Sequence, residues 1–337
     1  MRPGLGVLSA LAGLLVLAGQ ACAQERPGKL GADCGAPMDG ETGNAIDPRT
    51  GRAFFLDYPC DLKPGEKVLF ILLLHGSGSS GAWVRRYFPA VDLKERYRLV
   101  IATPTAATGP SARPGRPPAR SWSPKADAAH LLHVADLVYG AFGAENVRGF
   151  WIAGHSQGGL MADRLVCAPG FRGRTTGWLS LSGGRIGALR IAPEFWSSPV
   201  ASTGSRIPAF AARGTIGNAD EPDCDIDYIY ETGGNEIQAL PEGSPWADRF
   251  GCGPRVRLEE VVDDRPGQVS AAGPRGPVRP AWGGPPRPGT AEVFVFPGCR
   301  GGRLVADVVR LDKGHTEGLE PRITETLVRM MAEAAAR

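Results

Sequence analysis

Beyond its amino-terminal segment, the chain lacks any apolar run approaching the roughly 18 residues that a membrane-spanning helix needs. It also lacks an excess of either charge, because 38 Lys and Arg residues are balanced by 35 Asp and Glu residues and the arginines are scattered. There is no C-x-x-C pair and no internal repeat. These absences disfavour an integral membrane protein, a nucleic-acid-binding protein and a cysteine-based zinc site.

The first 23 residues predict a secretory signal peptide. Arg2 supplies a positive charge, the run Leu5–Ala18 is apolar, and Ala21-Cys22-Ala23 fits a cleavage site. The run is short for a membrane anchor, and Gly19-Gln20-Ala21 lacks the large aliphatic residue expected before a lipoprotein cysteine. We therefore expect a secreted or periplasmic protein without a stable membrane anchor, and one catalytic domain over residues 24–337.

Removal of the signal peptide leaves an even number of cysteines in an exported chain, which predicts disulfides. Free thiols are the main alternative, and the spacing favours a metal site least. The residues alone leave the connectivity open. The six cysteines are Cys34, Cys60, Cys167, Cys224, Cys252 and Cys299.

Strand-like and helix-like patterns alternate from about Phe54 onward, which predicts an α/β fold with a mainly parallel sheet and helices on both faces. Two stretches interrupt the alternation: residues 109–124, expected to be a loop, and the Pro- and Gly-rich residues 265–290, expected to be an insertion. Helices are predicted over 127–139, over 158–166 and from Pro321 onward. Strands are predicted over residues 67–74, 97–103, 147–153, 176–182, 207–213, 293–296 and 305–311.

The segment Gly154-His155-Ser156-Gln157-Gly158 matches G-x-S-x-G and lies between a predicted strand and a predicted helix. That context is the one in which a nucleophilic serine is presented on a sharp turn above a sheet edge. The two glycines fit such a turn, because a Cβ at either position would collide with the neighbouring elements. We therefore predict Ser156 as a nucleophile; an ordinary glycine turn is the alternative.

A second motif, Gly76-Ser77-Gly78-Ser79-Ser80-Gly81, fits the dinucleotide fingerprint G-x-G-x-x-G. That fingerprint requires an acidic residue about 20 positions later to bind the ribose. The corresponding segment, Ile101-Ala102-Thr103-Pro104, has none. We therefore interpret the motif as an oxyanion loop rather than as part of an NAD-dependent oxidoreductase, and expect no cofactor. The backbone N–H groups of Gln157 and Ser77 are the expected oxyanion donors.

A serine nucleophile needs a general base, and the chain has five histidines. His315 is the predicted base, because it follows a late strand and completes the order Ser…Asp…His of α/β-hydrolases. His75 belongs to the oxyanion loop, His155 is expected to point elsewhere, and His130 and His133 are expected to be packing or surface residues. The predicted acid is Asp220, with Asp223 and Asp225 as rivals in the same loop.

With these residues in view, the chain resembles the polyhydroxybutyrate depolymerase and feruloyl esterase family of secreted α/β-hydrolases, from about Tyr58 to Pro321. The resemblance implies an α/β-hydrolase fold, esterase activity and a Cys252–Cys299 disulfide close to the catalytic histidine. It rests on Leu73-Leu74-His75-Gly76, Trp151-Ile152-Ala153-Gly154-His155-Ser156-Gln157-Gly158-Gly159, Ser182-Gly183-Gly184, Trp246-Ala247-Asp248-Arg249-Phe250-Gly251-Cys252, Pro297-Gly298-Cys299 and Gly314-His315.

The chain departs from that family at the acid. The family's His-Gly-Thr-x-Asp corresponds here to Arg213-Gly214-Thr215, with Asp220 displaced by several positions. No substrate-binding module follows Arg337, which favours soluble esters or oligomers as substrates. The expected function is hydrolysis of small or oligomeric carboxylic esters, of the feruloyl, acetyl or hydroxyalkanoate type. A serine peptidase and a non-catalytic binding protein of hydrolase descent are the alternatives.

Overall fold

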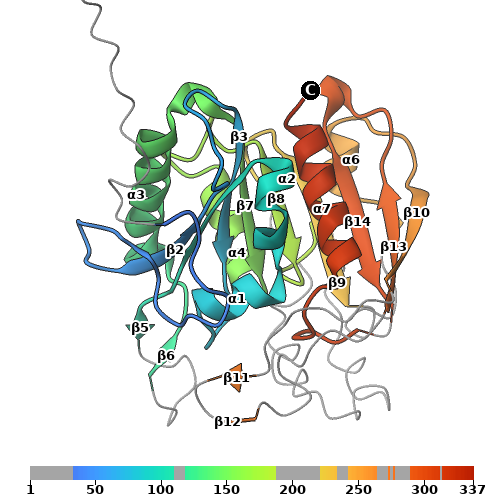
Figure 1. Ribbon diagram of the computed structural model, residues 1–337. Helices are drawn as coiled ribbons and strands as arrows, with labels where there is room; N and C mark the ends of the chain where they lie inside the picture. Colours follow the sequence, from blue (N-terminus) through green and yellow to red (C-terminus); the bar gives the residue numbers. More distant parts are fainter. Residues whose placement is uncertain are drawn as a thin grey trace, which may run out of the picture.

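The computed structural model describes residues 33–109, 118–186, 221–233, 242–263, 272–273, 276–277, 289–311 and 313–337. Its centre is a ten-stranded sheet in the order β1-β2-β4-β3-β7-β8-β9-β14-β13-β10. The six inner strands from β4 to β14 are all parallel, whereas the pairs at both edges are antiparallel. The parallel strands end at the edge where α1 begins, which is the lower edge in Figure 1.

The strands of this sheet, in chain order, are β1 (Ala45–Ile46), β2 (Ala53–Asp57), β3 (Val68–Leu74), β4 (Leu99–Pro104), β7 (Val147–His155), β8 (Gly177–Leu181), β9 (Asp227–Gly233), β10 (Val256–Asp263), β13 (Gly289–Val295) and β14 (Val305–Arg310). The α-helices are α1 (Gly81–Tyr87), α2 (Lys94–Tyr97), α3 (Pro124–Phe142), α4 (Gln157–Val166), α6 (Pro245–Arg249) and α7 (Pro321–Ala334). Two small hairpins pair β5 (Thr108–Gly109) with β6 (Ala119–Arg120), and β11 (Ala272–Gly273) with β12 (Gly276–Pro277).

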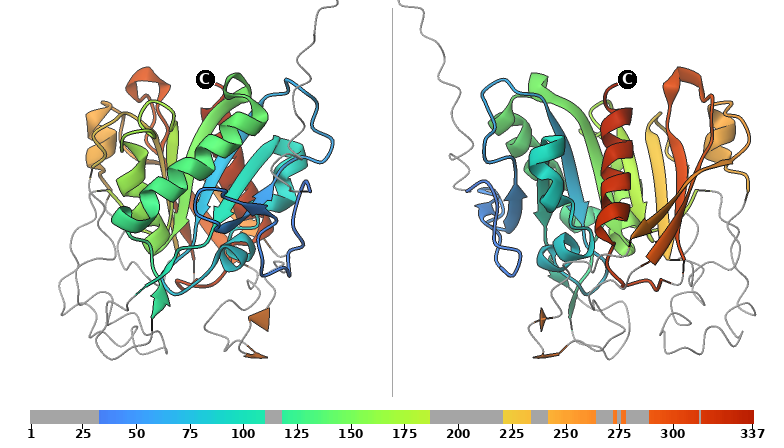
Figure 2. Two further views of the ribbon diagram at one scale, coloured as in Figure 1. Left: turned by 90° about the vertical axis from the view of Figure 1, so that its left-hand side faces the viewer. Right: turned by 45° about the vertical axis from the view of Figure 1, so that its right-hand side comes forward.

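Strand β3 explains the layering. All seven of its residues are buried, as expected for a strand covered on both faces. Because side chains alternate across a strand, Phe70 and Leu72 pack in the core that α3 and α4 cover, whereas Leu69 and Ile71 pack in the core that α1 and α7 cover. Figure 2 shows helices on both faces of the sheet. The continuous apolar run in the sequence therefore corresponds to a central strand between two helical layers.

Most of the predicted elements are confirmed, with small shifts at their ends. The strand expected from residue 97 begins at Leu99, because Tyr97 ends α2 and Arg98 adopts a left-handed conformation with φ 54°. Helix α7 begins at Pro321 as predicted and buries Ile323, Leu327, Met330 and Met331. The loop expected over 109–124 contains strand β6, and α3 starts at Pro124.

Four strands of the ten-stranded sheet were not predicted: β1, β2, β9 and β10. Strand β9 continues the parallel sheet beside β8, and β10 forms its antiparallel edge. The predicted strand over 207–213 lies outside the described residues, as do the signal peptide and most of the expected 265–290 insertion. Of that insertion, the structure describes β11, β12 and the first two residues of β13.

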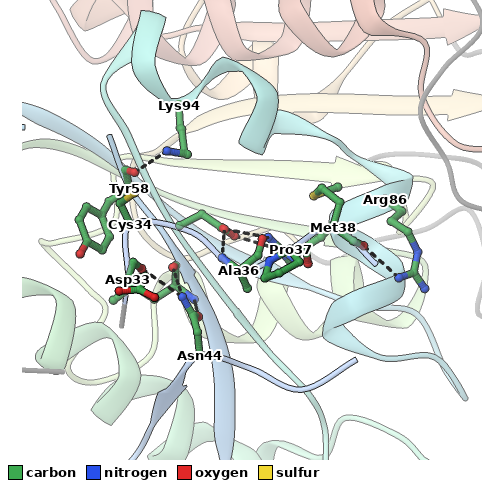
Figure 3. A network of polar contacts seen from close by, with 12 residues as sticks. Asp33, Cys34, Ala36, Pro37, Met38, Asn44, Tyr58, Arg86 and Lys94 are labelled. Atoms are coloured by element: carbon green, nitrogen blue, oxygen red, sulfur yellow. Dashed lines mark hydrogen bonds and ion pairs between the residues drawn. The ribbon is translucent and has the colours of Figure 1, made fainter. Parts of the chain in front are cut away.

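Three disulfides connect distant parts of the chain: Cys34–Cys60, Cys167–Cys224 and Cys252–Cys299. The third confirms the pairing that the family resemblance implies. The first disulfide ties down the segment before β1, which also bonds to α1. Arg86 of α1 donates to the carbonyl of Met38 in that segment at 3.3 Å, and Lys94 of α2 donates to the carbonyl of Tyr58, just after β2, at 2.7 Å. Both contacts are drawn in Figure 3.

Within the described residues, no helix has both the length and the apolar character required to cross a membrane. The topology is that of an α/β-hydrolase, as predicted: β3 lies between β4 and β7, the flanking β2 is antiparallel, and the central strand β7 leads through one sharp turn into α4. The carboxyl end of β7 is where this fold presents its nucleophile.

Candidate active site

Ser156 is the single residue between β7 and α4, and its backbone is strained. It has φ 53° and ψ −118°, a conformation that L residues rarely adopt and that concentrates at functional sites. A Cβ on Gly154 would collide with the backbone of Gly158, and a Cβ on Gly158 would collide with the carbonyl of Leu74. Both glycines are thus required by close packing around the turn, which matches the expected strand–turn–helix motif.

His315 lies beside this turn, in the loop between β14 and α7. The imidazole Nε2 of His155 lies 2.8 Å from the backbone carbonyl of His315, and the two ring centroids are 4.7 Å apart. Since His155 immediately precedes Ser156, the turn and the His315 loop are packed against each other. The structure therefore places the loop of the predicted base against the turn that carries the predicted nucleophile.

The side chain of His155 is buried beside the nucleophile turn. Its ring is enclosed by Trp83, Tyr87 and His315, with centroid separations of 5.1, 4.2 and 4.7 Å. Burial lowers the pKa of His155 well below 6.5, and the neighbouring His315 lowers it further. A neutral His155 with its proton on Nε2 donates to the His315 carbonyl, so this residue joins the nucleophile turn to the base loop.

The side chains of the other three histidines bond to other parts of the chain. His130 and His133, on α3, bond through Nδ1 to the two carboxylate oxygens of Asp47 at 2.7 and 2.5 Å. Both rings are buried, which confirms a packing role. His75 is fully buried at the start of the predicted oxyanion loop, and burial lowers its pKa to about 4.

The segment after β3 passes directly against the nucleophile. A Cβ on Gly76 would lie 2.7 Å from Nδ1 of His155 and 3.4 Å from Cβ of Ser156. Within the described part of the chain, neither the backbone N–H of Ser77 nor that of Gln157 has a hydrogen-bond partner. Gln157 is the first residue of α4, where the helix leaves its N–H groups free and the helix dipole favours negative charge. Donors without partners, on segments that pack at the nucleophile turn, are what an oxyanion hole requires, and the assignment of Ser77 and Gln157 stays a prediction.

Asp223 and Asp225, the rivals for the triad acid, lie at the opposite edge of the sheet. They precede β9, whose first residue is level with Trp151 through the register of β8. Ser156 is five residues further along β7, or about 16 Å at the usual rise of a strand. Both acids are exposed and form ion pairs, Asp223 with Arg172 and Asp225 with Arg249. Asp220 lies outside the described residues, so its role stays a prediction.

A buried group of charged side chains anchors the loop that carries His315. Arg310, at the end of β14, bonds to Glu231 at 2.5 Å and donates to the carbonyl of Gly318 at 3.2 Å. Lys313 bonds to Glu320 at 2.5 Å. Burial works against the positive charge of Arg310, but Glu231, Tyr87 and Glu320 outweigh it and raise the pKa of Arg310. The guanidinium thus stays charged and holds the loop at both ends.

Removing one member of this buried pair should be costly. We expect Arg310→Met to lower the free energy of unfolding by about 3–5 kcal/mol, because the carboxylate of Glu231 is left buried without its cation. The double variant Arg310→Met with Glu231→Leu should regain much of that loss. Urea unfolding measures both. The control is Arg257→Met, which removes an exposed partner of Glu260 and Glu292 and should cost less than about 1 kcal/mol. If Arg310→Met lost no more stability than the control, the buried Arg310–Glu231 pair would not have the stabilising role given to it here.

Among the described residues, one group has the spacing of metal ligands: Cys167, Asp223 and Cys224. Its two cysteines form a disulfide and have no thiolate to offer.

The glycine-rich loop after β3 packs on the nucleophile turn and continues into α1. The first turn of α1 is capped by Ser80 Oγ, which accepts from the N–H of Trp83 at 3.3 Å. This placement favours the oxyanion interpretation over dinucleotide binding.

No protein-family model matches the sequence, and no curated protein matches it either. Among solved structures, the chain is similar to an acetyl xylan esterase from Aspergillus awamori, with a TM-score of 0.46, 13% identity, and coverage of 84% of this chain and 96% of that one. It is also similar to the S-formylglutathione hydrolase of Staphylococcus aureus, with a TM-score of 0.33, 15% identity, and coverage of 55% and 76%. The site itself consists of a strained serine at the carboxyl end of the central strand, with the His315 loop packed against its turn.

Proposed function

We propose that the protein is a secreted serine esterase that hydrolyses carboxylic esters through an acyl-enzyme. The observation that carries this proposal is the strained turn at Ser156, packed through His155 against the loop of His315. Strain of this kind is retained only where the surrounding structure enforces it, and here it holds a hydroxyl at the sheet edge. The proposed roles are nucleophile for Ser156, base for His315 and orienting acid for Asp220.

In the first step, Ser156 Oγ attacks the ester carbonyl and its proton passes to His315. The carbonyl oxygen becomes negatively charged, and the N–H groups of Gln157 and Ser77 stabilise it, each donor contributing about 3 kcal/mol. His315 then gives the proton to the leaving alcohol, which leaves an acyl-Ser156 ester. A water molecule, deprotonated by the same imidazole, releases the acid and restores the serine.

The substrate class and the export are proposed on other grounds. The resemblance to secreted depolymerases and feruloyl esterases supports feruloyl, acetyl or hydroxyalkanoate esters as substrates. The predicted signal peptide and three disulfides support an extracellular or periplasmic location for a catalytic domain spanning residues 24–337.

A fluorophosphonate probe tests the proposal, because it phosphonylates only a serine activated by its neighbours. We expect the oxidised protein without residues 1–23 to take up one probe per chain, and peptide mass mapping should locate it on Ser156. The same preparation should hydrolyse p-nitrophenyl acetate and butyrate. Labelling with cleavage of peptide substrates instead of esters would favour the peptidase alternative. Neither labelling nor hydrolysis would indicate a non-catalytic protein.

A further inference from the structure

The side chain of Gln157 does not point toward the place where a substrate would react; it holds the segment between β6 and α3. Its Nε2 donates to Ser121 Oγ at 2.7 Å, and its Oε1 accepts from the backbone N–H of Trp122 at 3.1 Å. Both amide atoms are therefore used, which fixes the rotamer of the residue after the nucleophile. The same residue provides, from its backbone, one of the proposed oxyanion donors.

Trp122 extends this contact to the second proposed donor. Its indole Nε1 donates to the backbone carbonyl of His75 at 2.7 Å, with both residues buried, and its ring lies 4.8 Å from the imidazole. The adjoining Arg120 carbonyl accepts from the N–H of Gly78 at 2.7 Å. The β6–α3 segment thus bonds to the loop after β3 at two points.

The imidazole of His75 then orients the peptide unit that carries the Ser77 N–H. The N–H of Ala106 donates to Nε2 at 2.9 Å, so the ring proton is on Nδ1, which lies 2.7 Å from the carbonyl of Gly76. In a trans peptide the C=O and the following N–H point in opposite directions. Since the Gly76 carbonyl points at the imidazole, the Ser77 N–H points away from it.

We propose that Gln157 and Trp122 are positioning residues that hold the two halves of the oxyanion hole in register. The chain of contacts runs from the Gln157 side chain through Trp122 to His75 and the Gly76–Ser77 peptide. It connects the two amide donors, which belong to different elements and are 80 residues apart in the sequence. The inference rests on the proposed esterase function and specifies how its transition state is stabilised.

Trp122→Phe and Gln157→Leu test the inference, because each removes the side-chain hydrogen bonds and leaves both backbone donors in place. We expect kcat for p-nitrophenyl butyrate to fall about 10- to 100-fold in each variant, with KM changed by less than about twofold. The double variant should lose much less than the product of the two single losses, because both changes break the same chain of contacts.

A pair of inhibitors separates this role from a general structural one. A trifluoromethyl ketone forms a tetrahedral oxyanion with an active serine, whereas the matching methyl ketone binds mainly as a ground-state analogue. The inhibition constant of the first should rise by the factor lost in kcat, and that of the second should stay unchanged. The matched control is Trp178→Phe, at a buried indole in β8 whose N–H has no partner among the described residues, which should leave both constants and kcat near the wild-type values.

The outcomes distinguish this inference from the proposed function. If the wild-type protein hydrolyses esters and is labelled at Ser156, but Trp122→Phe and Gln157→Leu keep full kcat and full affinity for the trifluoromethyl ketone, the positioning role is wrong and the esterase assignment stands. A rise in KM alone, or equal weakening of both ketones, would likewise overturn it. If the wild-type protein neither hydrolyses esters nor takes up the probe, both proposals fail together.

Discussion

Replacing either Ser156 or His315 by alanine should lower kcat for p-nitrophenyl butyrate by about 10⁴- to 10⁶-fold, while KM stays within a few-fold of the wild-type value. Ser156→Ala removes the atom that forms the acyl-enzyme, and His315→Ala leaves the hydroxyl without a base. The two residues act in one step, so the double variant should be no slower than the slower single variant. Steady-state kinetics, with active-site titration to exclude wild-type contamination, measure all three.

Carboxylate variants provide the control for this series. Asp223→Asn changes an exposed acid that is paired with Arg172 at the far edge of the sheet, and its kcat should stay within about twofold of wild type.

Asp220→Ala should lower kcat by about 10⁴-fold if Asp220 orients the imidazole. A His315→Ala variant with more than a tenth of the wild-type kcat would show that another group is the base. Multiplicative losses in the double variant would contradict a shared step.

The parts of the fold that were predictable are those whose signal is local. Strand β3 is recognisable from its unbroken apolar run, and α7 from its proline start and the spacing of its buried side chains. Strand β9 was not predicted because its apolar pattern is interrupted by Asp227, Glu231 and Thr232. Its polar side chains are satisfied by residues far along the chain: Asp227 accepts from the N–H of Leu304, and Glu231 pairs with Arg310. No window of the sequence contains both partners.

The same distinction applies to the site. The turn at Ser156 was predictable because a strand, a glycine pair and a helix follow one another within a short segment. The contact of His155 with the His315 loop spans 160 positions, and that of Trp122 with His75 spans 47. Neither Trp122 nor the Gln157 side chain belongs to a motif that indicates its partner. Contacts of this kind depend on how separate elements pack, which a spacing rule does not describe.

Acid should destabilise the protein well before its carboxylates are protonated. Burial lowers the pKa of three histidines: His75 to about 4, His155 well below 6.5, and His130 to a value below 6.5 despite its bond to Asp47. Each binds a proton more readily in the unfolded chain, so the free energy of unfolding falls as the pH drops below about 6.5. Each group removes at most about 1.4 kcal/mol per pH unit, and His75 alone about 3 kcal/mol by pH 4.

The carboxylates set the lower limit of that pH window. Burial raises the pKa of Asp47, but bonds to His130, Thr50, Arg49 and His133 outweigh it and hold the value below 3.8, so Asp47 adds to the loss only below about pH 4. Burial raises the pKa of Asp57 and Asp227, so these two bind a proton more readily in the folded chain and oppose the loss as the pH falls. The decline between pH 6.5 and about 5 therefore belongs to the histidines.

Urea unfolding at pH 7.5, 6.0 and 5.0 measures this loss. We expect the free energy of unfolding to fall by several kcal/mol over this range, with a slope of more than one proton per chain between pH 6 and 5. His75→Gln, which keeps a donor and an acceptor but does not titrate, should be less stable at pH 7.5 and show a slope smaller by up to one proton. Equal stability of the wild-type protein at pH 7.5 and 5.0 would show that these imidazoles reach solvent on protonation, and an unchanged slope in His75→Gln would exclude His75 as one of the titrating groups. Because the same neutral His75 orients the Gly76–Ser77 peptide, the pH at which the fold weakens should also limit the pH at which the oxyanion donors remain in place.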